Sequence, residues 1–401
     1  SGKVLDSHGH EFGQLLKDLP GPVLAYCRTG TRSTTMWALS QSTQLTPAQI
    51  IDAAAHAGYD MRGLMKRILN GGVTPQDAVD AEHDVVIVGG GAAGVAVAAS
   101  ILARDPNADV AIIEPADVHY YQPGWTLVSA GIFKPQDTAR SMTRVLPAGV
   151  RWIKSAVAAF EPEHSRVVLE GCRLVQYRQL IVAAGLKLDW NAIPGLAESL
   201  GQHGVTSNYR YDLAPYTWQL VQGLRRGTAL FTQPLPPIKC AGAAQKAMYL
   251  AADHWRQQGV LQDIQIRFCS AAEALFHVPE YVPALMSYVN AYGVDLRLKE
   301  RLVSVNGPAQ EATFGWTDGQ GQAHTEVRKF DLLHVVPPQT APDFIRLSPL
   351  ADSSGWVAVN AQTLQHPNHS NVHALGDVSG SPNTKTAAAA RAQAPVVAHN
   401  V

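Results

Sequence analysis

The sequence predicts an α/β protein in which strands and helices alternate along most of the chain. Apolar residues make up 46% of the 401 positions, which is enough for sizeable cores and favours two or three domains. Over residues 84–401, short apolar runs alternate with segments of helical periodicity. A glycine-rich turn at 89–94 joins the first of these runs to a helical segment, as in folds that bind a dinucleotide.

The charge balance excludes one class of function. Lys and Arg number 32 and Asp and Glu 33, so the net charge is −1. Such a chain offers no basic field for nucleic acid. Charged residues are only 16% of the chain, against roughly 25% in typical soluble proteins, which leaves room for a membrane surface or a buried cofactor. The histidines show no metal-ligand spacing, so we expect no metal site.

Gly89, Gly91 and Gly94 fit the pattern G-x-G-x-x-G after an apolar strand. In this pattern the first glycine makes a tight turn, the second lets the backbone approach a pyrophosphate, and the third lets the helix pack closely on the strand. The helix then begins near Ala92 and Ala93, and its N-terminus faces the phosphates.

A second strand is predicted at 110–113, and Glu114 follows it, 20 residues beyond Gly94. An acid at this place suits the hydroxyls of a ribose. A membrane span over 85–103 is the alternative, because these 19 residues carry no charge. The glycines at the strand-to-helix junction disfavour that alternative.

Two later segments favour FAD over NAD as the dinucleotide. The run 180–185 ends at Gly185 and precedes Ile-Pro-Gly at 193–195, and a later segment, VHALGD, ends in Gly376 and Asp377. They resemble the second and third signatures of flavoproteins with two dinucleotide-binding domains. The resemblance implies a tandem Rossmann-like fold that binds FAD, in which Asp377 holds the ribityl chain of the flavin.

Such flavoproteins often carry a second glycine triad for a nicotinamide, here expected after the run 227–231. The following residues contain no triad, and Pro234, Pro236 and Pro237 break any phosphate cradle. Cys240 stands there instead. We interpret the second domain as one that lost nicotinamide binding and gained a thiol facing the flavin, which disfavours a type II NADH dehydrogenase.

Several stretches look like sulfide:quinone oxidoreductase, a family shared by bacteria and mitochondria. They span 119–131, 236–250, 332–343, 354–366 and 376–390. In that family the cysteine of the KCAG motif is a redox and sulfane-carrying residue, and Cys240 matches it. The family's flavin contacts carry over to residues 89 through 94, Glu114, Gln122, Val157, Asp377 and Lys385.

The resemblance implies that hydrosulfide opens a disulfide, which leaves a persulfide on Cys240 and a thiolate. The thiolate then passes electrons to the flavin, and a membrane quinone reoxidises the flavin. Lys239 is expected to favour the thiolate. The family's second redox cysteine lies in a tail beyond residue 401 that also contacts the membrane, so we expect residues 1–401 alone to oxidise sulfide poorly. The expected location is the cytoplasm, peripheral on the inner face of a bacterial membrane. Cys172 and Cys269 are interpreted as core thiols.

A second cysteine motif, CRTGTRS, runs from Cys27 to Ser33 between a short apolar strand expected at 22–26 and a helix expected at 33–39. Inward-pointing N–H groups of such a loop form an anion nest, and the helix N-terminus adds positive potential. Both lower the pKa of the cysteine and make it nucleophilic. Arg32 can clamp the oxygens of a bound oxyanion.

The loop resembles those of rhodanese sulfurtransferases and tyrosine phosphatases, and its short spacing matches the former. It is most similar to a sulfurtransferase/phosphatase-like domain found fused to bacterial sulfide-handling enzymes, and covers only part of that domain. The resemblance implies that Cys27 receives sulfur and passes it to a thiol acceptor. Phosphatase activity and a plain cysteine loop without catalysis are the alternatives.

We therefore predict a partial rhodanese/phosphatase-like α/β domain followed by a tandem Rossmann-like flavoprotein. The predicted segments are a partial domain at 1–72, a linker at 73–83, the FAD-binding domain at 84–195 and 336–401, and a second Rossmann-like domain at 196–335. The alternatives are an NAD(P)H- and FAD-dependent oxidoreductase fused to a cysteine-dependent phosphatase, and a scaffold that binds FAD without catalysis.

Overall fold

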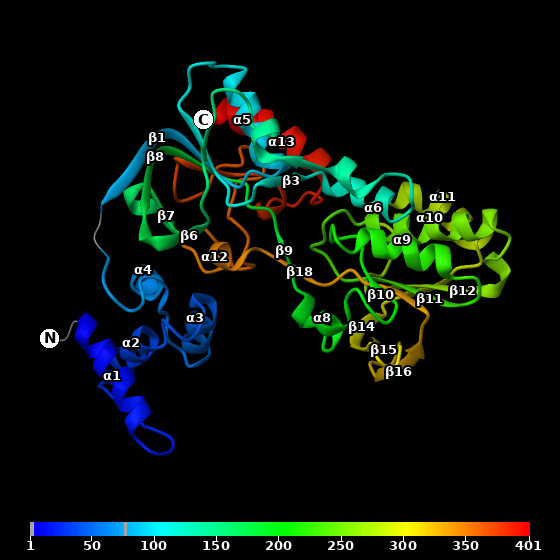
Figure 1. The fold of residues 1–401 in the computed structure, drawn as a ribbon, viewed down its shortest axis with the longest axis horizontal. Helices are drawn as coiled ribbons and strands as arrows, with labels where there is room; N and C mark the ends of the chain where they lie inside the picture. The colour runs from blue at the N-terminus through cyan, green and yellow to red at the C-terminus, as the bar shows by residue number, and fades with distance from the viewer. Residues whose placement is uncertain (1–3, 76–77) are drawn as a thin grey trace.

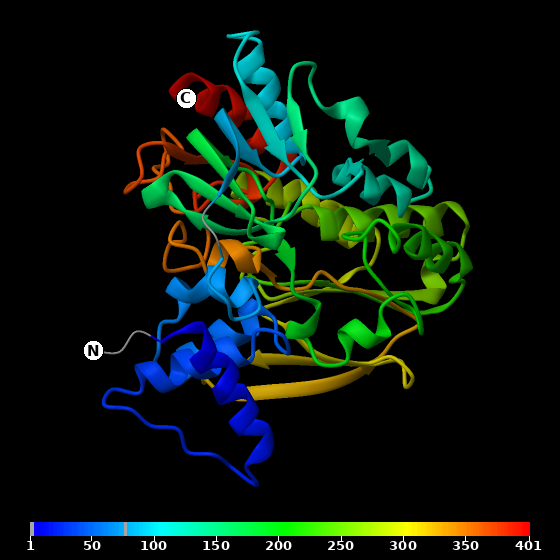
Figure 2. The same ribbon diagram turned by 60° about the vertical axis from the view of Figure 1, so that its left-hand side comes forward.

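The computed structural model describes residues 4–75 and 78–401, and its elements fall into three groups (Figure 1). A small helical unit at the N-terminus lies against a mixed sheet, and a second sheet domain lies on the other side of the molecule (Figures 1 and 2). The predicted linker falls partly on residues 76 and 77, which lie outside the described residues. The C-terminal end of the predicted linker, residues 79–83, belongs to strand β1, which begins at Val79, where it pairs with Leu174 of strand β8. This part of the linker prediction is wrong.

The N-terminal unit contains four α-helices in its described part: α1 (Asp6–Asp18), α2 (Thr31–Ser40), α3 (Pro47–His56) and α4 (Met65–Leu69). The sequence predicts a helix that is capped by Thr46 and runs to about residue 57, and helix α3 begins there. Thr46 accepts a hydrogen bond from the Gln49 N–H, and the Gln49 side chain accepts one from the Thr46 N–H. The sequence has helical character from about residue 12 to residue 19, and helix α1 begins six residues earlier, at Asp6.

The strand expected at 22–26 is wrong. Residues 22–26 form no strand, and Leu24 and Tyr26 are each 87% exposed. An apolar run becomes a strand only where a neighbouring strand takes up its backbone hydrogen bonds. The described part of the unit supplies no such neighbour, because its elements are helical.

The first sheet has seven strands in the order β5-β2-β1-β8-β7-β6, with β19 beside β8. Strands β1, β2, β5, β8 and β19 are parallel, whereas β6 and β7 form an antiparallel hairpin next to β8. Helices α5 and α13 lie side by side on one face of the sheet (Figure 1). The elements of this part are β1 (Val79–Val88), α5 (Ala92–Leu102), β2 (Val110–Ile113), β3 (Val118–Tyr120), α6 (Trp125–Val128), β4 (Ala139–Ser141), α7 (Met142–Val145), β5 (Arg151–Ile153), β6 (Val157–Glu161), β7 (Arg166–Leu169), β8 (Leu174–Val182), β9 (Lys187–Leu188), β18 (Gln339–Thr340), α12 (Asp343–Arg346), β19 (Val372–Ala374) and α13 (Ala387–Asn400).

The second domain is built on a parallel five-stranded sheet in the order β10-β17-β11-β12-β13. An apolar core under α9, α10 and α11 covers one face, and an antiparallel sheet of β14, β15 and β16 packs on the other. The elements are α8 (Leu196–Ser199), β10 (Val205–Thr206), α9 (Ala214–Gly223), β11 (Gly227–Gln233), α10 (Ala243–Gln257), β12 (Ile264–Ser270), α11 (Val282–Ala291), β13 (Asp295–Leu298), β14 (Arg301–Asn306), β15 (Glu311–Thr317), β16 (Ala323–Lys329) and β17 (Leu332–His334).

Polar and apolar contacts join the N-terminal unit to the first sheet domain. The Arg346 guanidinium binds the Asp52 carboxylate through two hydrogen bonds of 3.0 and 2.8 Å, and Lys66 pairs with Glu161 at 2.9 Å. Leu347 packs into the apolar core of the unit. The unit is therefore attached to the first sheet domain by its helices α3 and α4.

Candidate functional site

The glycine turn at the end of β1 has the geometry that a dinucleotide requires. A Cβ atom at Gly94 would lie 1.9 Å from the Gly89 carbonyl oxygen, so only glycine lets α5 pack this closely on β1. Gly89 has a φ of +105°, which favours glycine. A Cβ atom at Gly91 would meet nothing within 4 Å. The N-terminus of α5 therefore opens onto free space, where its N–H groups can receive a pyrophosphate.

Glu114 lies at this same turn. Its carboxylate accepts hydrogen bonds of 2.8 Å from the Gly90 N–H and from the Ala116 N–H. The ring of His119 lies beside it, with Nδ1 3.1 Å from the Gly90 carbonyl oxygen. A cavity of about 330 Å³ opens beside His119 and is lined by Tyr121, Asp137, Thr138, Arg140 and Val145 as well. The position of the carboxylate suits a ribose, which remains a prediction.

The Gly-Asp segment from the end of the chain meets the glycine turn. Strand β19 runs parallel to β8, and Gly376 follows it with a φ of +73°. A Cβ atom at Gly376 would lie 2.8 Å from the Cβ of Ala93, so Gly376 rests directly on the first turn of α5. The fold therefore joins residues 89–94 and Asp377, nearly 300 positions apart, in one site.

Lys385 is a buried cation in this site. Its ammonium donates to the Asp377 and Ser379 carbonyl oxygens, at 2.5 and 3.0 Å, and lies 3.7 Å from the centre of the Trp356 ring. Burial lowers the pKa of Lys385 to about 8. The ammonium is held by dipoles and a ring face, and its titration lies close to physiological pH.

The loop 234–242, between β11 and α10, carries Cys240 into the same site. The Cys240 N–H donates to the Lys385 carbonyl at 2.8 Å, and the Lys239 ammonium pairs with the Asp377 carboxylate at 2.8 Å. Cys240 is a free, partly exposed thiol. Lys239 was expected to favour the Cys240 thiolate. Its ammonium is directed to the Asp377 carboxylate instead, and this corrects the expected direction of the side chain.

The remaining predicted flavin contacts lie at separate places. Gln122 is exposed in the turn before α6, Val157 is buried at the start of β6, and Gly185 follows β8 with a φ of +71°. Their contacts with a flavin remain predictions.

Two residues that the sequence did not single out hold the Cys240 loop. The Tyr209 hydroxyl donates to the Lys239 carbonyl at 2.8 Å and lies 3.3 Å from the Cys240 carbonyl oxygen. The Gln339 side-chain oxygen accepts a 2.6 Å hydrogen bond from the Lys239 N–H. No sequence signal identifies them, because both act on main-chain atoms of a distant segment.

The loop 27–33 of the N-terminal unit has the properties of an anion nest. Gly30, with a φ of +79°, precedes α2, and the Ser33 hydroxyl lies 3.8 Å from the Cys27 sulfur. The backbone N–H of Ser33, which has the largest effect, and those of Thr29 and Arg32 lower the pKa of the Cys27 thiol to about 6, although burial acts in the opposite direction. The Arg32 side chain is exposed. Cys27 is therefore largely a thiolate at neutral pH.

The fold does not bring Cys27 and Cys240 together. The α1–α2 loop lies at the outer end of the N-terminal unit, whereas Cys240 precedes α10 in the second domain (Figures 1 and 2). A direct passage of sulfur from one thiol to the other is therefore not supported by this arrangement.

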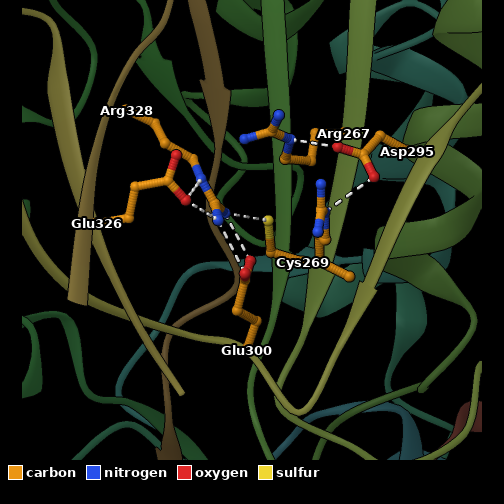
Figure 3. Close-up of polar contacts among 7 residues, drawn as sticks. Arg267, Cys269, Asp295, Glu300, Glu326 and Arg328 are labelled. Atoms are coloured by element: carbon orange, nitrogen blue, oxygen red, sulfur yellow. Dashed lines mark hydrogen bonds and ion pairs between the residues drawn. The ribbon is translucent and has the colours of Figure 1, made fainter. Parts of the chain in front are cut away.

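The prediction that Cys172 and Cys269 are core thiols is confirmed. Both are buried, and burial raises the pKa of each. Cys269 accepts a 3.5 Å hydrogen bond from Arg328, which also binds Glu300 and Glu326 (Figure 3). This cluster joins β12 to the antiparallel sheet and is structural.

In the described part of the chain, no helix has the length and apolar character needed to cross a bilayer. The segment 85–103, for which a membrane span was the alternative, forms β1, the glycine turn and α5.

The fold and the site define a flavoprotein of the class with two dinucleotide-binding domains. The model of the pyridine nucleotide-disulphide oxidoreductase family matches residues 83–394. A second model, that of the beta-lactamase hydrolase-like protein, phosphatase-like domain, matches residues 11–44.

The chain is 40% identical to the mitochondrial sulfide:quinone oxidoreductase of Mus musculus over 315 residues, which cover 79% of this chain and 70% of that protein. It is 39% identical to that of Dictyostelium discoideum over 320 residues, with the same coverage. The crystal structure of the sulfide:quinone oxidoreductase from Aquifex aeolicus superposes with a TM-score of 0.68 at 18% identity and covers 79% of this chain and 76% of that one. The chain belongs to the pyridine nucleotide-disulphide oxidoreductase family and, within it, to the sulfide:quinone oxidoreductases.

The cofactor of these flavoproteins is FAD, and the residues present fit it. The space beyond Gly91 and the N-terminus of α5 suit its pyrophosphate, and the segment from Gly376 to Lys385 closes the site on the other side.

Proposed function

We propose that the chain oxidises hydrosulfide at Cys240 and delivers the electrons to a membrane quinone. The observation that carries this proposal is the attachment of Cys240 to the Asp377–Lys385 segment through the hydrogen bond from the Cys240 N–H to the Lys385 carbonyl. A partly exposed thiol is thereby fixed next to the residues expected to hold the flavin.

FAD, when bound, supplies the two-electron acceptor for sulfide and the donor for the quinone. Cys240 contributes the atom that receives the sulfur. The net change at Cys240 would be formation of an S–S bond to the sulfur of hydrosulfide with loss of its S–H proton. The two electrons released would be taken up by FAD, which residues 89–94, Asp377 and Lys385 would hold. The product is a persulfide on Cys240, which an external thiol removes by attack on the outer sulfur.

The second domain supports sulfide rather than a nicotinamide as the electron donor. The connection from β11 to α10 is the nine-residue loop 234–242, which holds three prolines and lacks a glycine triad. The proposal predicts that anaerobic addition of sulfide bleaches the flavin absorbance of the purified protein and that addition of NADH does not. Reduction by NADH alone would contradict the proposal. A failure of sulfide to reduce the flavin would contradict it as well.

We further propose that Cys27 is the nucleophile of a sulfur-transfer site that takes its sulfur from a diffusible persulfide. The separation of the two cysteine loops supports a carrier, and the nest around Cys27 supports a thiolate. The match of residues 11–44 to a phosphatase-like domain keeps phosphatase activity as the second candidate. It would appear as hydrolysis of aryl phosphates without sulfide.

The low pKa of Cys27 gives a direct test of this site. The rate of Cys27 alkylation by iodoacetamide, followed by mass spectrometry, should rise with pH through a midpoint near pH 6 and then level off. The variant Cys27→Ser should lose transfer of sulfur to a thiol acceptor while sulfide still reduces the flavin. A midpoint near that of a free thiol, or unchanged transfer, would contradict the proposal.

We place the protein at a membrane surface, because its proposed acceptor is a lipid-soluble quinone. The curated relatives described above are mitochondrial, and attachment to the inner face of a bacterial membrane is the form that the N-terminal domain suggests. Sedimentation with quinone-containing vesicles tests this location.

A further inference from the structure

Cys240 has an unusual backbone conformation that its surroundings must maintain. Its φ is +50°, in the left-handed region that non-glycine residues rarely adopt. Such a conformation persists only where neighbouring groups determine it. The groups that maintain this backbone conformation therefore also determine where the Cys240 thiol points.

Three anchors from separate segments hold the main chain at this point. The Cys240 N–H is bound by the Lys385 carbonyl at 2.8 Å, and the Lys239 N–H by the Gln339 side chain at 2.6 Å. The Tyr209 hydroxyl binds the Lys239 carbonyl at 2.8 Å and faces the Cys240 carbonyl at 3.3 Å. Of the three anchors, Tyr209 is the one that reaches both residues.

Tyr209 belongs to a buried polar segment, residues 207–209, directly after β10. Its neighbour Asn208 donates to the Thr126 hydroxyl at 3.0 Å and lies within 3.4 Å of the Ala243 carbonyl, at the start of α10. Burial, with the nearby Cys240 as a smaller cause, raises the pKa of Tyr209 far above its usual value, so the phenol stays protonated. A phenol that stays protonated, in a buried segment, keeps its O–H as a hydrogen-bond donor.

We propose that Tyr209 is a positioning residue that holds Cys240 in its left-handed conformation and aims the thiol at the flavin site. This inference rests on the proposed function of Cys240 for its consequence in catalysis. Its structural part, that the Tyr209 hydroxyl restrains the thiol, can be tested without any turnover.

The test uses Tyr209→Phe in the full chain loaded with FAD. Loss of the hydroxyl frees the loop, so alkylation of Cys240 by iodoacetamide should become about tenfold faster, whereas sulfide-driven flavin reduction should become about tenfold slower. The KM for the quinone should not change. Opposite changes in the two rates distinguish misplacement of the thiol from general damage, which would not spare the KM.

Tyr216→Phe is the matched control, because the Tyr216 hydroxyl accepts a 3.2 Å hydrogen bond from the Gly204 N–H, away from the loop. Equal alkylation rates of Cys240 in Tyr209→Phe and this control would overturn the proposal. If sulfide does not reduce the flavin of the unmodified protein, the proposed function fails while alkylation still decides on Tyr209. If Tyr209→Phe does not fold, Tyr209→Met also lacks the hydroxyl and should produce the same pair of changes; unchanged rates there would overturn the proposal.

Discussion

Replacing Cys240 by serine is expected to lower the rate of sulfide-driven flavin reduction by at least about 1,000-fold. A serine hydroxyl is neither ionised at neutral pH nor able to accept sulfur as a persulfide, so the proposed reaction loses the atom on which the sulfur is placed. The measurement is stopped-flow absorbance of the flavin after anaerobic mixing with sulfide.

The loss should not arise from loss of cofactor. The bond from residue 240 to Lys385 is made by the main chain and survives the substitution, as does the ion pair of Lys239 with Asp377. FAD content should therefore equal that of the unmodified protein. Cys172→Ser is the matched control, since this buried thiol lies near the Lys66 carbonyl in the N-terminal unit. Sulfide should reduce the flavin of this variant at the normal rate. Rapid reduction in Cys240→Ser would remove Cys240 from the proposed chemistry.

The sequence predicted those parts of the site whose requirements are local. Gly94 must be glycine because of an atom five residues away, and the cap of α3 depends on Thr46 and Gln49. The residues of such motifs lie within a few positions of one another in the chain. Cys240 was also identified from its own short motif, and the structure places it beside Asp377 and Lys385.

The parts that were missed depend on partners elsewhere in the chain. The run 22–26 has strand character, yet no described strand of its unit lies beside it, and the local pattern could not show this. Tyr209 and Gln339 bind main-chain atoms of Lys239, which lies 30 and 100 residues away from them. Every residue carries such main-chain atoms, so the amino-acid types do not indicate these contacts. The direction of the Lys239 ammonium was likewise set by Asp377, which lies 138 positions further on.

The ion cluster around Arg328 joins residues that lie far apart in the sequence, and we expect it to have a large effect on the free energy of unfolding. The Arg328 guanidinium and the Glu300 carboxylate have exposed fractions of only 6% and 7%. Their two hydrogen bonds measure 2.5 and 2.8 Å, and Glu326 binds the same guanidinium (Figure 3). Burial lowers the pKa of Arg328, but the bonds to both carboxylates outweigh this effect and raise it.

Replacing Arg328 by alanine is expected to lower the free energy of unfolding by about 3–5 kcal/mol, because the buried Glu300 carboxylate then has no counter-charge. Cys269 also loses its hydrogen-bond donor, and Phe314 loses the guanidinium that lies 4.7 Å from its ring centre. The measurement is urea denaturation followed by far-UV circular dichroism at neutral pH, with the protein saturated with FAD.

Two further variants separate the buried charge from lost packing. Arg297→Ala removes an arginine that is half exposed and pairs with Asp295 at 2.9 Å, so it should cost less than about 1 kcal/mol. The double variant Arg328→Met with Glu300→Leu removes both buried charges and keeps the volume, and it should recover most of the loss, since a buried ion pair is often replaceable by apolar residues. If Arg328→Ala is as stable as Arg297→Ala, the cluster does not hold the two sheets of the second domain together. If the double variant is as unstable as the single one, lost packing rather than an unpaired carboxylate explains the effect.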